Sequence, residues 1–281
     1  MNCERDDARE LLAFYLDAGV DALLGEAPVD RFADEPPAAP SPQRTRPNGE
    51  AVRPAVSGQA ARTDRDATRA PAAPPSSEAA IMAAREAAKA AKDLDELRAL
   101  LESFEGCMLR ATATQLVFAD GNPQGRVMFV GEAPGRDEDM AGLPFVGRSG
   151  KLLDLMLATI GLDRTQVYVA NVVPWRPPGN RTPTPQETAI CLPFIRRQIE
   201  LAGADILVCL GQPSTQTLLE TKEGITRTRG RWFKFDTGSR EIRALATYHP
   251  AFLLRSPLQK RLAWRDFLAL KKALAGQGAR S

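Results

Sequence analysis

Three stretches of the chain combine glycine and proline with a few side chains that can do chemistry. The first spans residues 131–150 and holds five glycines, two prolines, several carboxylates and one aromatic residue, Phe145. The second spans residues 171–181, and the third spans residues 248–257. A glycine-rich loop that opens onto a helix lets the backbone approach a ligand closely. We therefore expect a ligand-binding loop in the first stretch, although a surface turn with solvated acids fits the same residues. Neither a phosphate loop nor a dinucleotide fingerprint is present, so a nucleotide cofactor is not indicated.

His249, in the third stretch, is the only histidine of the chain. A lone histidine is often structural. This one follows an apolar run and precedes a loop that contains prolines. A histidine at such a junction favours a functional site.

These stretches must be held by a scaffold, and the pattern of apolar residues predicts its type. Short apolar runs alternate with segments of helical periodicity along the chain. The expected strands are 126–130, 167–172, 206–210 and 243–247, and the expected helices are 151–160, 185–201, 213–220 and 259–274. Such alternation predicts an α/β fold with a parallel sheet and helices on both faces. In that architecture ligands bind at the carboxyl ends of the strands, where Gly131, Asn171, Gly211 and His249 fall.

The chain divides into three regions by composition. We expect an N-terminal helix within residues 1–33, because apolar side chains recur at helical spacing over 8–25. Residues 34–78 are rich in Pro, Ala, Arg, Ser and Thr and predict a disordered linker. The folded domain is then 79–281, and it opens with a helical segment that runs to about residue 104. The sequence leaves three alternatives open for the N-terminal helix: it docks on this domain, it binds a partner, or it does neither.

Composition and charge exclude some classes of protein. No uninterrupted apolar run approaches the length of a membrane helix, and the N-terminus lacks the basic and apolar regions of a secretory signal. We therefore expect a cytoplasmic protein with no membrane partner. The formal net charge is +2. It is negative over the first 80 residues and positive beyond them, which weakly favours a polyanionic partner.

The four cysteines are Cys3, Cys107, Cys191 and Cys209. No two of them form a C-x-x-C pair, so their spacing alone predicts neither a zinc site nor a redox site. Cys209 lies in an apolar run and is expected to be a small buried residue.

Taken together, the three stretches resemble the family 4 uracil-DNA glycosylases. The motifs are GEAPG-x-x-ED-x-x-G-x-PFVG-x-x-G-x-LL, RPPGNR and HPA-x-LLR, in that order. The resemblance covers about residues 94–274. It implies a three-layer α/β/α sandwich around a four-stranded parallel sheet, in agreement with the alternating pattern.

By this resemblance the protein is an enzyme that hydrolyses the N-glycosidic bond of a flipped-out uracil in DNA. The product is an abasic site for base excision repair. Since no lysine occupies a motif position, a monofunctional glycosylase is expected rather than one with a lyase step. The alternatives are a broader glycosylase that also accepts hypoxanthine or xanthine, and a catalytically silent module that binds damaged DNA.

The resemblance also implies a role for each residue of the pocket. Phe145 stacks on the uracil ring, and Asn171 reads its hydrogen-bonding edge. His249 donates a hydrogen bond to uracil O2, and Glu132 handles the attacking water. Two further positions support catalysis or hold the pocket, namely Glu138 and Asn180.

Other positions are implied in contacts with the base or with DNA. Gly131 and Ala133 belong to the substrate-binding loop. The loop that presses into the minor groove and expels the base contains Pro250, Leu254 and Arg255, and Arg181 is expected to contact DNA. The implied partner is uracil-containing DNA. We expect a monomer, with a repair protein as one candidate partner for the N-terminal helix.

The chain departs from the family at its metal cluster. Typical members bind a [4Fe–4S] cluster through four cysteines, and such clusters need thiolates. Two of the four positions are retained here as Cys107 and Cys191, whereas the other two are Phe104 and Trp175. From this double replacement we expect no metal and no cofactor, with the aromatic residues filling the space and the two cysteines remaining as relics.

Overall fold

The computed structural model describes residues 77–277 of the 281-residue chain. The predicted N-terminal helix and nearly all of the predicted linker lie outside these residues. The first described helix begins at Ser77, two residues before the domain boundary expected from composition.

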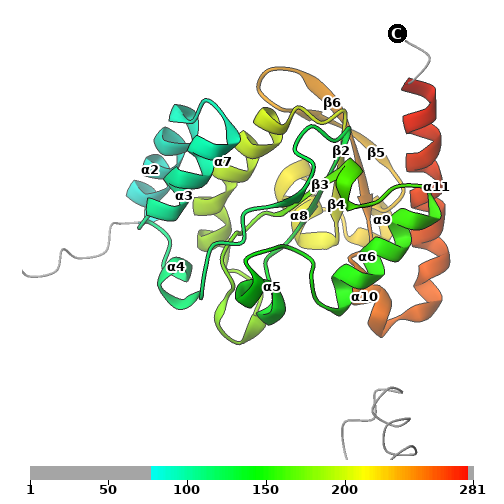
Figure 1. The fold of residues 1–281 in the computed structure, drawn as a ribbon, viewed down its shortest axis with the longest axis horizontal. Coiled ribbons are helices and arrows are strands. Elements are labelled where there is room, and N and C mark those ends of the chain that lie inside the picture. The colour runs from blue at the N-terminus through cyan, green and yellow to red at the C-terminus, as the bar shows by residue number, and fades with distance from the viewer. Residues whose placement is uncertain (1–76, 278–281) are drawn as a thin grey trace, which may run out of the picture. The chain divides into compact units, whose positions relative to one another are not determined.

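A six-stranded sheet forms the centre of the domain (Figure 1). Its strand order is β1-β3-β2-β4-β6-β5. The four inner strands β3, β2, β4 and β6 are parallel, and the short β1 and β5 pair antiparallel at the two edges. The strands are β1 (Asp120–Gly121), β2 (Val127–Gly131), β3 (Val167–Asn171), β4 (Ile206–Leu210), β5 (Trp232–Asp236) and β6 (Glu241–Thr247). The four predicted strands are thus the parallel centre of the sheet.

Helices connect the strands and cover the sheet. The α-helices are α2 (Ser77–Ala90), α3 (Leu94–Ser103), α4 (Leu109–Thr112), α5 (Arg136–Ala141), α6 (Arg148–Thr159), α7 (Pro185–Ala202), α8 (Gln212–Leu219), α9 (Ile225–Thr228), α10 (Pro250–Arg255) and α11 (Lys260–Gln277). Short 3-10 turns are η1 (Arg164–Gln166), η2 (Pro178–Asn180) and η3 (Pro257–Gln259). The expected helices correspond to α6, α7, α8 and α11.

Every residue of β2, β3 and β4 is buried, as continuous apolar runs predict for strands covered on both faces. Alternate side chains of β2 enter two different hydrophobic clusters. Met128 and Val130 join the cluster that includes α2, α3 and α7. Val127 and Phe129 join the cluster built by α6 and α11. The helices α2 and α3 lie on one side of the sheet and α11 on the other (Figure 1), so the predicted three-layer α/β/α sandwich is confirmed.

The single helical segment expected from residue 79 to about 104 is two helices. The break follows from the side chain of Asp93, which accepts a hydrogen bond from the backbone N–H of Glu96 at 2.8 Å. The Glu96 carboxylate in turn accepts from the N–H of Lys92 at 2.8 Å. The Asp93 cap starts a new helix at Leu94, which periodicity alone did not separate from α2.

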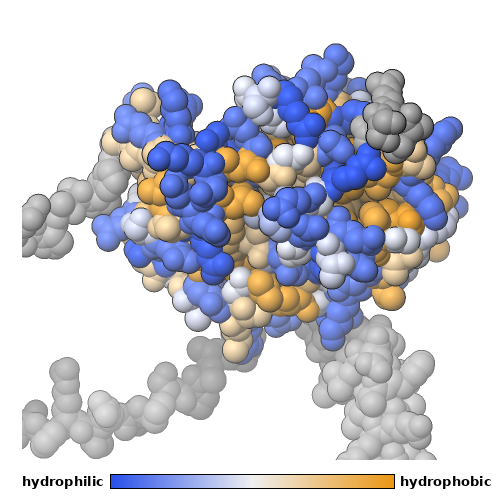
Figure 2. All heavy atoms as spheres, turned by 45° about the horizontal axis from the view of Figure 1, so that its top comes forward, coloured by the Kyte–Doolittle hydropathy of each residue, from blue (hydrophilic) through white to orange (hydrophobic). Residues whose placement is uncertain are grey.

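Hydrophilic side chains predominate on the face shown in Figure 2, and apolar side chains form separate patches there. Within residues 77–277, no helix combines the length and the apolar character that crossing a membrane requires.

Candidate active site

A cleft of about 610 Å³ opens at the carboxyl ends of the parallel strands. Its volume lies in the range that holds a small organic ligand. The loops after β2, β3, β4 and β6 all contribute to its walls. The sequence-predicted residues in these walls are Glu132, Ala133, Glu138, Phe145, Asn171, Asn180, Arg181, His249 and Arg255. The structure thus brings together residues from all three motif stretches.

Three predicted residues lie outside the walls. Pro250 is buried at the first position of α10, and Leu254 is half-buried on the same helix. Gly131 lies behind the cleft at the end of β2. A Cβ on Gly131 would lie 2.5 Å from Oδ1 of Asn171 and 2.6 Å from Cζ of Phe145. Glycine at this position therefore leaves room for the Asn171 and Phe145 side chains, which both lie against it.

Phe145 forms one side of the cleft. Its side chain is buried, and its ring centroid lies 5.4 Å from that of His249, with 30° between the ring planes. Its φ of +56° is in the left-handed region, which is unfavourable for a bulky residue. Strained backbone of this kind gathers at functional sites.

Glu138 stabilises the loop that carries Phe145. One of its carboxylate oxygens accepts a hydrogen bond from the N–H of Gly135 at 3.1 Å. The other accepts from the N–H groups of Val146 at 3.1 Å and Gly147 at 3.0 Å. Both oxygens are thus engaged by the backbone, an arrangement suited to holding the pocket.

His249 caps helix α10. Its Nδ1 accepts a hydrogen bond from the N–H of Ala251 at 3.1 Å. In a neutral imidazole the other nitrogen then carries the proton, so Nε2–H is left as a donor. Burial, with a smaller contribution from the positive charge of Arg255, lowers the pKa of His249 to about 4. The ring is therefore neutral at physiological pH.

Glu132 follows β2 and holds an unpaired oxygen. Its Oε1 is the one buried side-chain oxygen or nitrogen without a hydrogen-bond partner in the described part of the chain. Burial raises the pKa of this carboxyl group, and a hydrogen bond with the Thr182 side chain opposes the rise. A buried acceptor without a partner is costly, which points to a ligand or water as its natural partner.

Asn180 and Arg181 also line the cleft. Asn180 has a φ of +55°, and its Oδ1 accepts a hydrogen bond from Nε of Arg176 at 2.7 Å. Arg181 makes a bidentate pair with Glu187 at 2.7 and 2.8 Å. The guanidinium expected to contact DNA is thus held by a carboxylate at the start of α7.

The sequence prediction missed some residues of the site. Thr182, Ser149 and Gln212 line the cleft, and Thr182 directly follows the RPPGNR motif that should have pointed to it. Arg164 donates hydrogen bonds to the carbonyl oxygens of Pro144 and Phe145 in the first stretch. It lies outside the three stretches and outside the walls, so no motif indicated it.

Comparison with known proteins assigns this arrangement to a family. The family model of the Uracil DNA glycosylase superfamily matches residues 118–268, which is more than half of the chain and includes every loop of the cleft. The chain belongs to the uracil-DNA glycosylase superfamily.

Within this superfamily, the similar proteins carry the name type-4 uracil-DNA glycosylase. The protein of Archaeoglobus fulgidus is 39% identical over 180 residues, covering 63% of this chain and 90% of the relative. That of Sulfurisphaera tokodaii is 39% identical over 184 residues, covering 64% and 84%. That of Thermotoga maritima is 39% identical over 175 residues, covering 61% and 90%. The resemblance to family 4 is thereby confirmed.

The expectation of no cofactor is contradicted by this kinship. Type-4 uracil-DNA glycosylases are iron–sulfur enzymes, and membership among them points to a [4Fe–4S] cluster. That expectation rested on the replacements at Phe104 and Trp175 alone.

The residues at the former ligand positions fit such a cluster only in part. Cys107 and Cys191 are both buried free thiols, and a hydrogen bond between them lowers the pKa of Cys107 and raises that of Cys191. Trp175 is buried, and Phe104 packs edge-on against Phe194 at 5.0 Å. Within residues 77–277, no group of three or more His, Cys, Asp or Glu side chains is placed to hold a metal ion. At the four ligand positions, the described residues thus supply two of the four thiolates that such a cluster needs.

Proposed function

We propose that this protein hydrolyses the N-glycosidic bond of a uracil extruded from DNA and leaves an abasic site. The observation that carries the proposal is the state of His249. Its pKa of about 4 keeps it neutral, and the bond from Ala251 to Nδ1 leaves Nε2–H as the donor. A neutral donor in a cleft lined by Phe145 and Asn171 suits a departing uracil.

The chemistry separates charge. When the bond between uracil N1 and the sugar C1′ breaks, its electron pair leaves with the base, and negative charge develops on uracil O2. A hydrogen bond from His249 Nε2–H to O2 stabilises this charge more in the transition state than in the ground state. The sugar meanwhile becomes positive at C1′.

Glu132 serves the sugar side of the reaction. A water molecule bound at its buried Oε1 adds its oxygen to C1′ and gives a proton to the carboxylate. The negative charge of Glu132 also stabilises the positive sugar. The raised pKa makes this carboxylate a stronger base than an exposed one.

Base recognition divides between two buried side chains. The Asn171 amide pairs with uracil N3–H and O4, and a cytosine would leave buried polar groups unpaired. Phe145 offers its ring face for stacking with the flipped base. Both side chains lie against Gly131 and line the cleft, and the part of the cleft beside them, called the slot below, is where the flat base would lie.

The surroundings of the slot fit DNA as the partner. Arg255 and Arg181 lie at the walls of the cleft, where they can meet phosphates. No lysine lines the cleft in the described part of the chain, which supports simple hydrolysis without a Schiff base. The monomeric state, the cytoplasmic location and a repair partner for the N-terminal helix remain predictions.

A base-release panel tests the proposal. The substrates are oligonucleotides with uracil, hypoxanthine, xanthine or thymine, each in single and double strands. We expect release of uracil and an alkali-labile site in its place. Release of hypoxanthine or xanthine as well would favour the broader glycosylase.

Asn171→Ala is expected to abolish selective uracil release, with Asn122→Ala as the matched amide control outside the cleft. Retained binding of uracil-containing DNA by the wild type, with no release of any base, would favour a silent binding module and contradict the proposal.

A further inference from the structure

The strained residue Phe145 is held from outside the cleft. Its carbonyl oxygen accepts a hydrogen bond from Nη2 of Arg164 at 2.6 Å. The carbonyl oxygen of Pro144 accepts one from Nη1 of the same side chain at 3.2 Å. Hydrogen bonds from a charged guanidinium are stronger than those between neutral groups. Arg164 therefore fixes two successive peptide groups of the loop that presents the Phe145 ring.

Arg164 is itself fixed by two carboxylates. Its Nη1 lies 2.9 Å from Oδ2 of Asp120 in β1, and its Nε lies 2.6 Å from Oδ1 of Asp154 in α6. The Arg164 side chain is only 21% exposed. These pairs tie the Phe145 loop to an edge strand and to a helix at once.

A second contact holds the same peptide group. A Cβ on Gly150 would lie 1.7 Å from the carbonyl oxygen of Phe145, so the first turn of α6 packs directly against it. The backbone at Phe145 is thus confined between α6 and the Arg164 guanidinium. Its ring faces the cleft and lies 5.4 Å from the ring of His249.

We propose that Arg164 is a positioning residue that sets the orientation of the Phe145 ring and thereby the affinity of the slot for the extruded base. The inference rests on the proposed function, because it names what supports the stacking side of that site. Arg164 does not line the cleft, so it acts on the base only through Phe145.

The mechanism predicts a particular kinetic signature. Stacking contributes alike to the bound base and to the transition state, so its loss raises KM and leaves kcat nearly unchanged. It also weakens inhibition by free uracil, which occupies the slot without any need for base flipping. For Arg164→Gln we expect KM for a uracil-containing oligonucleotide and Ki for free uracil to rise together by about tenfold. This increase is smaller than the full loss of affinity expected when a stacking ring is removed altogether.

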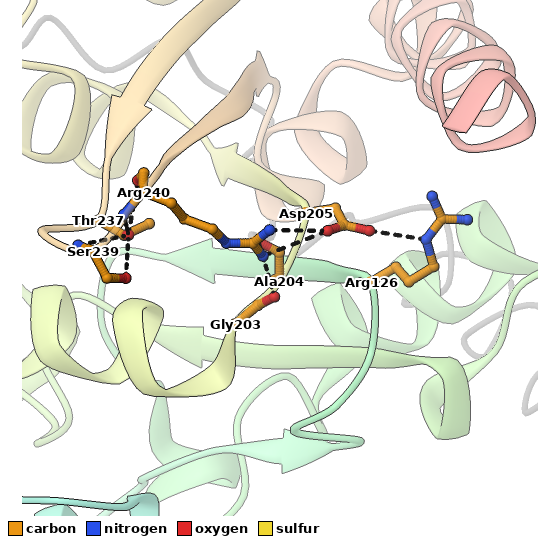
Figure 3. A network of polar contacts seen from close by, with 7 residues as sticks. All are labelled: Arg126, Gly203, Ala204, Asp205, Thr237, Ser239 and Arg240. Atoms are coloured by element: carbon orange, nitrogen blue, oxygen red, sulfur yellow. Dashed lines mark hydrogen bonds and ion pairs between the residues drawn. The ribbon is translucent and has the colours of Figure 1, made fainter. Parts of the chain in front are cut away.

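Arg240→Gln is the matched control. Arg240 also donates to two backbone carbonyls, those of Gly203 and Ala204, and pairs with a carboxylate, Asp205 (Figure 3). It lies away from the walls of the cleft. Its replacement should lower the thermal midpoint of unfolding while KM and Ki stay as in the wild type.

A double-mutant cycle separates positioning from general loosening. In a Phe145→Ala background the ring is gone, so Arg164→Gln should add no further increase in the Ki of free uracil. Should Arg164→Gln fail to fold, Asp154→Asn removes one anchor and keeps the two carbonyl contacts, with a smaller rise of Ki in the same direction.

The possible outcomes are distinct. Wild-type uracil release tests the proposed function separately from any Arg164 variant. With an active wild type, an Arg164→Gln protein that keeps its Ki, or that loses kcat at constant KM, overturns the positioning role. An additive effect in the Phe145→Ala background does the same.

Discussion

The two ends of the parallel strands use polar groups in opposite ways. We call the side of the sheet where these strands end the carboxyl edge, and the side where they begin the amino edge. At the carboxyl edge, Glu132 keeps a buried oxygen without a partner, and Phe145 and Asn180 adopt left-handed backbone. At the amino edge, Asp205 pairs with Arg126 at 3.0 Å and with Arg240 at 3.4 Å (Figure 3). Those groups are paired with one another and partly exposed to water.

The contrast shows where this fold places its unfavourable interactions. Unpaired polar atoms and strained backbone lower stability, and they persist only where the surrounding structure enforces them. The one buried side-chain atom without a partner in residues 77–277, Glu132 Oε1, belongs to the cleft. So do two of the three non-glycine residues with positive φ, Phe145 and Asn180, whereas the third, Glu220, ends α8. This distribution supports the proposal that the carboxyl edge serves binding and chemistry, and it predicts that the ion pairs of the amino edge affect stability and not activity.

The largest effect is expected from Glu132→Gln, which keeps the shape of the side chain and removes its charge and basicity. The rate of uracil release should fall by about 10²–10⁴ with little change in the affinity for substrate DNA. Single-turnover base release measures it. Glu102→Gln, on an exposed face of α3, is the control and should match the wild type. If Glu132→Gln released uracil at the wild-type rate, Glu132 would not take part in the reaction.

The pH profile follows from the same residue. Because burial raises the pKa of Glu132, its carboxylate form is lost as the pH falls through a value above the ordinary 4.5. Uracil release should therefore decline on the acidic side, and Glu132→Gln should abolish this dependence. His249, with its pKa of about 4, stays neutral over that range and adds no second step there. A decline that persists in Glu132→Gln would assign it to another group.

Replacing His249 should have the next largest effect. Loss of the Nε2–H donor is expected to slow base release by about 10²–10³. Alanine also removes the cap of α10, at about 1 kcal/mol of stability, whereas serine restores a capping oxygen. His249→Ala and His249→Ser should thus be equally slow but differ in thermal unfolding. A serine variant with restored activity would show that capping, and not donation, is the role of His249.

The sequence predicted the frame of this site well, because its signals are local. Continuous apolar runs mark the buried strands, and Asn171 and His249, at or just after the ends of two of those strands, both line the cleft. The edge strands β1 and β5 were not predicted, because β1 has only two residues and only one residue of β5, Phe235, is buried.

Contacts between segments that are distant in sequence could not be predicted from the pattern of residues. Arg164 reaches carbonyl groups about 20 residues away in sequence, and no spacing rule relates them. The left-handed φ of Phe145 was equally hidden, because non-glycine residues seldom adopt it. The prediction of no cofactor was wrong for a different reason. It rested on Phe104 and Trp175 at two cysteine positions, whereas kinship with the type-4 enzymes points to a cluster.

A smaller but sharp effect is expected from Gly131→Ala. The added methyl group must displace Asn171 Oδ1 or the Phe145 ring, which lie 2.5 and 2.6 Å from its position. A displacement of about 1 Å in such a site can cost about 10²-fold in rate. Gly276→Ala, where nothing lies within 4 Å, is the matched control and should leave uracil release unchanged. Normal kinetics of Gly131→Ala would show that the slot adapts.

The smallest effect is expected at the amino edge, from Asp205→Asn. Its carboxylate joins two arginines, but the side chains are 34–47% exposed, so water and salt screen the pairs. We expect a loss of about 1 kcal/mol or less in the free energy of unfolding. The loss should shrink in high salt, as chemical denaturation at two ionic strengths would show. Uracil release should not change. Asp205 directly precedes β4, whose far end leads into Gly211 beside His249. A shift in KM or kcat would mean that β4 transmits changes from the amino edge to the cleft. The two edges would then not act separately on stability and on activity.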